Sequence, residues 1–121
     1  MGNRASVIFF DRNTVSPSVY LHWHGHAVPT WLNQLKSLME GRFQDAAYAA
    51  ARFVGICHME IDSNLSLGIY CNACRLADLR DSRAMAQLSP GDAGVIVVDT
   101  ADFSWKAYGG YLADYNSKIE R

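Results

Sequence analysis

The sequence lacks most features that identify a class of protein at sight. No apolar run approaches the roughly 20 residues that span a bilayer, so we expect no membrane insertion. The formal net charge is −1, from 11 basic and 12 acidic residues, which makes nucleic acid an unexpected partner. The Walker loop and the motifs GxGxxG, GxSxG and HExxH are absent, so no familiar enzyme signature is present.

Cysteine is also scarce, with only Cys57, Cys71 and Cys74. An odd number of cysteines does not complete a disulfide framework. No apolar signal-peptide core follows the first four residues. We therefore expect reduced thiols and a cytoplasmic protein.

The chain has 121 residues, and half of them are hydrophobic. Both values are typical of one domain with its own core. Such a chain folds without a disulfide or a metal ion. Repeats, low-complexity segments and linkers are absent, so residues 1–121 are predicted to form a single domain. Residues 112–121 are predicted to be a frayed or helical tail.

Alternating apolar residues predict the strands. Residues 5–10 and 19–24 read as a hairpin, with Val19, Leu21 and Trp23 on its buried face. Further strands are predicted at residues 65–70, 95–98 and 103–108, and the last two form a second hairpin. The run at residues 95–98 is apolar throughout, as in a central strand buried on both faces.

Two amphipathic helices are predicted between the first hairpin and the third strand. The first begins near Pro29 and ends before Gly41, and the second begins at the N-cap Asp45 and fades around residue 58. A short helix also fits residues 76–85. The order β-β-α-α-β-β-β predicts an α+β fold, with a mainly antiparallel five-stranded sheet and two helices packed on one face.

Histidines suggest a metal site. His22 and His24 are two apart on a predicted strand, so both imidazoles would face one metal, and His26 lies beyond Gly25. Cys71 and Cys74 form a lone CxxC that could complete a composite zinc site. The ordinary alternative is that no cofactor binds: the histidines are surface residues, and the cysteines are two simple thiols.

Aromatic residues suggest a binding surface. Tyr20, Tyr70 and Tyr108 fall by parity on the face opposite the apolar one, together with His22, His24 and Lys106. Tyrosine is enriched in interfaces, because it combines contact area with a polar tip. These six residues are the predicted binding residues, and no catalytic residue is predicted.

Three short motifs carry a resemblance to a group of proteins. The sequence MGNRA at residues 1–5, YLHWHG at residues 20–25 and AYGGY at residues 107–111 resemble segments of small uncharacterised proteins from phage and plasmid genomes. The resemblance implies a small accessory protein of a mobile element, which binds and blocks a host component.

We therefore predict a non-enzymatic binding protein that inhibits or sequesters a host protein and forms a homodimer. One alternative is a zinc-binding module or metal-dependent enzyme that uses His22 and His24. Another is a nucleotide or nucleic-acid binder that stacks bases on an open aromatic sheet face.

Overall fold

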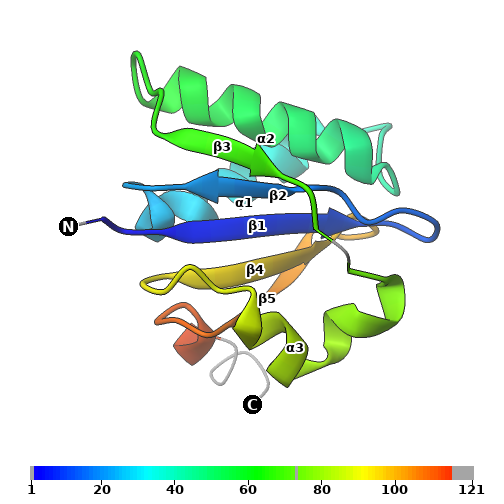
Figure 1. The fold of residues 1–121 in the computed structure, drawn as a ribbon. Coiled ribbons are helices and arrows are strands. Elements are labelled where there is room, and N and C mark those ends of the chain that lie inside the picture. The colour runs from blue at the N-terminus through cyan, green and yellow to red at the C-terminus, as the bar shows by residue number, and fades with distance from the viewer. Residues whose placement is uncertain (1, 73, 116–121) are drawn as a thin grey trace.

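The computed structural model describes residues 2–72 and 74–115, and it shows one sheet with helices on both of its faces (Figure 1). The strands are β1 (Ala5–Phe10), β2 (Ser18–Leu21), β3 (Leu67–Tyr70), β4 (Gly94–Asp99) and β5 (Ser104–Tyr108). They lie in the order β3-β2-β1-β4-β5. The predicted α+β class is confirmed.

The sheet is mixed, because its central pair is parallel. β1 and β4 run parallel, whereas β1–β2, β2–β3 and β4–β5 are antiparallel. The two hairpins are thus joined side by side through strands far apart in sequence. A parallel pair requires a crossover connection, and here the chain between residues 10 and 94 supplies it.

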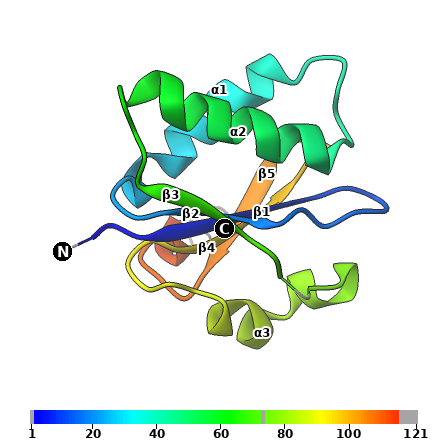
Figure 2. The ribbon, with the colours of Figure 1, turned by 45° about the horizontal axis from the view of Figure 1, so that its top comes forward.

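The main core lies between the sheet and the helices α1 (Val28–Leu38) and α2 (Ala46–Glu60), which share one face (Figure 2). Pro29 occupies the first turn of α1, where its missing N–H costs no hydrogen bond. The Asp45 side chain caps α2 by accepting a hydrogen bond from the Tyr48 amide at 3.1 Å. The buried helix side chains are Val28, Trp31, Leu32, Leu35, Ala46, Ala49, Phe53, Ile56 and Cys57.

The prediction that helices pack on one face alone is incomplete. The 3-10 helix η2 (Leu76–Arg80) and the short helix α3 (Ser82–Gln87) lie on the second face, over β1 and β4. A second buried cluster forms there from Ile8, Leu79, Met85, Val95 and Val97. The apolar residues at alternate positions of β1 and β4 explain this cover, because both faces of a central strand must be buried.

The first hairpin ends earlier than predicted. β2 stops at Leu21, and the chain turns into the 3-10 helix η1 (Gly25–Ala27). Val19 and Leu21 are buried as expected, but Trp23 is 44% exposed, so its assignment to the buried face is wrong. The cause is the turn itself, because face alternation holds only while the backbone stays extended.

Within the described residues, no helix is both long enough and apolar enough to cross a membrane.

Candidate functional site

A continuous row of rings lies on the second face of the sheet, at the β3 end that α3 leaves uncovered. It consists of Tyr70, Tyr20, His22 and Trp23, and we name it the aromatic row. Tyr70 meets Tyr20 edge-on at a centroid distance of 5.9 Å. Tyr20 and His22 are 6.1 Å apart, and His22 meets Trp23 edge-on at 4.5 Å. Such edge-to-face pairs hold the rings in fixed relative orientations.

A hydrogen bond fixes the centre of the row. The Tyr20 hydroxyl and Nδ1 of His22 are 2.8 Å apart. Tyr70 is 58% exposed, so the row offers an accessible apolar surface with polar tips. The predicted grouping of Tyr20, His22 and Tyr70 is therefore what the structure shows.

The strand beside the row, β3, is an edge of the sheet. Residues 63–74 contain no charged side chain, and Asp62 and Arg75 flank them. Leu65 is 85% exposed and Ile69 is 63% exposed. Natural edge strands are usually protected by charges, proline or bulges, because their unpaired backbone groups attract other strands. This edge combines apolar side chains with the absence of charge.

A polar cluster borders the aromatic row at His22. The guanidinium of Arg4 donates to the Asp92 carboxylate at 2.9 Å, and the Arg4 backbone amide donates to the same oxygen at 3.0 Å. A hollow of about 390 Å³ is lined by Gly2, Arg4, His22 and Asp92. Through His22 the cluster and the row form one continuous surface.

The three motifs of the resemblance meet at this cluster. The Asn3 amide donates to the His22 carbonyl at 2.8 Å, and the Gly25 amide donates to the Asn3 carbonyl at 2.7 Å. The Tyr111 hydroxyl donates to the Asn3 side-chain oxygen. Residues from all three motifs therefore hydrogen-bond to one another and stabilise this end of the fold.

The Arg4–Asp92 pair sets a testable pH dependence. Hydrogen bonds from the backbone amide and then from the guanidinium of Arg4 lower the pKa of Asp92. Because the pKa is lowered in the folded protein, the pair stabilises the fold at pH values above about 3.9, the ordinary pKa of aspartate. This stabilisation is lost as the pH falls through the lowered pKa, where the carboxylate becomes protonated. In Arg4→Ala the guanidinium is lost but the backbone amide still donates to Asp92. The pKa of Asp92 should therefore rise, but not as far as the ordinary aspartate value.

The measurement is an NMR titration of the Asp92 carboxyl carbon. Arg75→Ala serves as the control, because it removes the comparable contact with Asp78 at 3.4 Å. An unchanged Asp92 titration in Arg4→Ala would contradict this account of the pair.

The structure separates the residues of the composite metal site. His22 pairs with Ser66, since its amide donates to the Ser66 carbonyl at 3.1 Å. At the other end of β3, Tyr70 pairs with Ser18, and Cys71 follows it. The histidine and cysteine ends of β2 and β3 are thus about five residues apart, or roughly 16 Å.

The three histidines do not gather at one point, although the rings of His24 and His26 lie 6.3 Å apart. His24 packs beside Trp31 of α1 at a ring distance of 5.9 Å, on the side of the main core, and not with His22 on the second face. Nδ1 of His26 is 2.8 Å from the Asn3 side-chain nitrogen. In residues 2–72 and 74–115, no group of three or more His, Cys, Asp or Glu side chains is arranged to hold a metal ion.

The cysteines differ in environment. Cys71 is exposed, whereas Cys57 is buried in α2. Burial raises the pKa of the Cys57 thiol to about 12, so this thiol stays protonated and unreactive at neutral pH. Cys57 is a core residue.

Tyr108 and Lys106 share the second face with the row but lie apart from it. β1 and β4 stand between them and Tyr20, with Ser6 and Val95 in the intervening positions. Both residues line a separate pocket of about 310 Å³ over β4 and β5. The structure therefore divides the predicted single patch into two separate groups of residues.

Sequence reasoning missed Trp23, Arg4 and Asp92 as neighbours of His22. Parity assigned Trp23 to the core, and nothing local links Arg4 to Asp92, which lie 88 positions apart. The pairing of β1 with β4 brings the last two together. No protein-family model, curated protein or solved structure matches this chain.

Proposed function

We propose that the protein is a non-enzymatic binding protein that takes up an extended segment of a partner protein as a sixth strand beside β3. The observation that carries this proposal is the edge strand β3, which lies in a stretch of sequence without charged residues and has Leu65, Ile69 and Tyr70 exposed in or beside it. Strand addition uses the main chain for affinity and alternate side chains for specificity.

The ladder of β3 defines which groups would pair. Ser66 bonds to His22 on the β2 side, and the register continues through Gly68 opposite Tyr20. In an antiparallel ladder, the intervening residues direct their backbone groups away from the neighbour. Leu67 and Ile69 therefore present their N–H and C=O groups at the outer edge.

The chemistry of the occupant follows from the side chains on either face. On the second face the new strand would lie beside Tyr70 and could contact the aromatic row. On the helix face it would meet Ile69, which is 63% exposed. The partner segment is thus extended, apolar at alternate positions and free of proline at its pairing positions.

A different protein fits this surface better than a second copy. Two copies joined edge to edge would continue one sheet, so each copy would leave its own Tyr20, His22 and Trp23 uncovered. A partner that supplies a strand and an adjoining segment covers both the edge and the row. Inhibition or sequestration of a host component is the role that such capture would serve.

The test is selection of random linear peptides displayed on phage, followed by binding measurements on the variants Ile69→Lys and Met59→Lys. We expect enriched apolar peptides that bind the native chain and lose about tenfold or more in affinity on Ile69→Lys, because lysine protects an edge. Met59 is 71% exposed on α2, so Met59→Lys should change nothing. Amide exchange at Leu67 and Ile69 should slow in the complex.

Two results would overturn the proposal. One is the absence of any peptide whose binding depends on Ile69. The other is a native dimer in sedimentation equilibrium that Ile69→Lys converts to a monomer, since a second copy would then occupy the edge.

A further inference from the structure

We propose that the pocket between η2 and β5 is a binding site for a small flat organic anion, in which one or two rings carry a single carboxylate or phosphate. The pocket has a volume of about 310 Å³ and lies on the second face of the sheet, away from β3. Its lining residues are Phe10, Leu76, Leu79, Arg80, Val97, Asp99, Ser104, Trp105, Lys106 and Tyr108.

The floor of the pocket is apolar and firmly held. Leu79 and Val97 are 3% and 5% exposed, and both belong to the buried cluster under η2 and α3. Phe10 and Tyr108 pack against the same cluster and are partly buried. Small-molecule sites typically combine such a preformed apolar lining with a few polar groups that orient the ligand.

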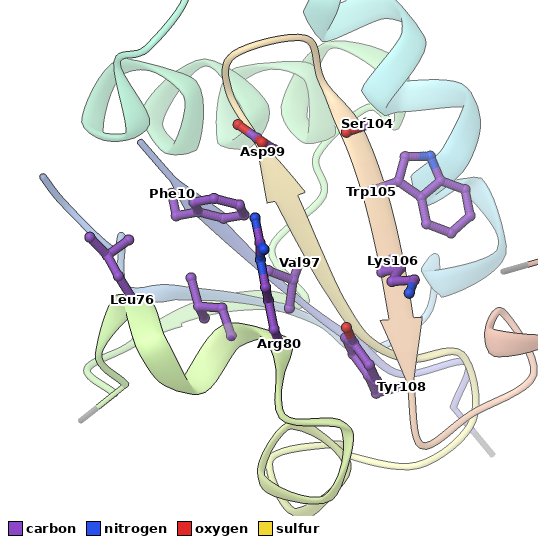
Figure 3. A pocket seen from close by; sticks show the side chains of 10 residues that line it. Phe10, Leu76, Arg80, Val97, Asp99, Ser104, Trp105, Lys106 and Tyr108 are labelled. Carbon is purple, nitrogen blue, oxygen red and sulfur yellow. The ribbon is translucent and has the colours of Figure 1, made fainter. Parts of the chain in front are cut away.

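The polar groups at the rim favour an anion. Arg80 comes from η2 and Lys106 from β5, so the two cations approach the pocket from different walls (Figure 3). Asp99 is the acidic lining residue, and its carboxylate already accepts the Ala101 amide at 2.9 Å. The lining thus contains two basic side chains and one acidic one.

Arg80 is the best placed anion ligand. Its side chain extends from η2 across the pocket toward Phe10 (Figure 3). Within residues 2–72 and 74–115, its guanidinium makes no ion pair with an acidic side chain. A guanidinium can bind a carboxylate or phosphate through two parallel hydrogen bonds, which fixes the orientation of a planar ligand.

The size and shape of the pocket limit the ligand. Its volume lies at the lower end of the range of small-molecule sites, about 300 to 1,000 Å³, so a dinucleotide is too large. The aromatic side chains of Phe10 and Tyr108 can pack against a ring. Tyr108 and Ser104 place hydroxyl groups at the rim, where they can hydrogen-bond the anionic group.

The probes are naphthoate, naphthyl phosphate and the neutral naphthalenemethanol, each titrated into nitrogen-labelled protein and followed by NMR. We expect the amide signals of η2, β4 and β5 to shift with at least one anionic probe. Naphthalenemethanol should bind about tenfold more weakly, since it lacks a charge-assisted contact. Comparison of naphthoate with naphthyl phosphate shows which anion the site prefers.

The matched variants are Arg80→Ala and Arg83→Ala. Both arginines are exposed, but Arg83 lies on α3 and does not line the pocket. We expect Arg80→Ala to weaken the anionic probe about tenfold and Arg83→Ala to leave its affinity unchanged. Ile69→Lys should also leave it unchanged, because β3 and β5 are opposite edges of the sheet.

Shifts confined to residues outside the pocket, or no shift with either anionic probe at about 1 mM, would overturn the proposal. Equal affinity for the neutral and anionic probes would overturn its assignment to an anion. If Arg80→Ala and Arg83→Ala weakened binding of the anionic probe equally, the probe would be attracted by general surface charge. That result would also overturn the proposal.

Discussion

Replacing Gly25 with alanine is expected to lower the free energy of unfolding by about 3 kcal/mol. A Cβ at this position would lie 2.6 Å from the Asn3 carbonyl oxygen, 2.8 Å from Cβ of Ala93 and 3.1 Å from the Arg4 carbonyl oxygen. These contacts are backbone atoms or a Cβ, so no flexible side chain can move aside. The backbone of Asn3 and Arg4, just before β1, would have to shift, and this would disturb the hydrogen bond from the Gly25 amide to the Asn3 carbonyl.

Chemical denaturation of the native chain and the variant measures the change. The matched control is Gly55→Ala in α2, where a Cβ meets no atom within 4 Å. That substitution should stabilise the protein by about 0.5 kcal/mol or slightly more, because alanine is the better helix former. Equal unfolding midpoints for Gly25→Ala and the native chain would show that position 25 has room for a side chain.

Truncation of Phe53 to alanine is expected to cost about 4 kcal/mol. Phe53 is fully buried in α2 and meets Phe9 of β1 at a ring distance of 5.6 Å. It also meets Trp31 of α1 edge-on at 6.5 Å. One side chain thus joins two helices and the sheet, and its removal leaves a cavity that all three must tolerate.

Met59→Ala on the same helix is the control for Phe53→Ala. Its side chain is 71% exposed, so the change in unfolding free energy should stay within about 0.5 kcal/mol. If the two truncations had similar effects, α2 would not be held to the sheet by its Phe53 face. Thermal unfolding should rank the variants in the same order.

The elements with a strong local pattern were predictable from sequence. The apolar spacing of α1, the Asp45 cap of α2 and the continuous apolar run of β4 each reflect contacts that the structure contains. The parallel pairing of β1 with β4 was not predictable in the same way. Strand pairing depends on the competition between distant segments, and no local pattern records its outcome.

The candidate site shows the same division. Tyr20 and His22 belong to one strand and its continuation, so parity placed them together correctly. The alternation of side chains along the strands also grouped them with Tyr108. Alternation predicts which face of the sheet a residue lies on, but not how far apart two residues on that face are. His24 was misplaced because the strand ends at Leu21, and a turn cancels the alternation of faces beyond that residue.

The central position of β4 has a consequence for synthesis. During translation, β4 emerges after β1, β2, α1, α2 and β3. The edge of β1 that pairs with β4 therefore stays unpaired until residues 94–99 leave the ribosome. Until then Val7, Ile8 and Phe9 belong to an unfinished edge, which is prone to aggregation. The closing of this parallel pair is therefore expected to be the late, slow step of folding, because its contacts span nearly 90 positions of the chain. A nascent chain stalled before residue 94 should bind chaperones that recognise apolar segments, and one that also contains residues 94–115 should not, because it includes β4, β5 and the buried Leu112.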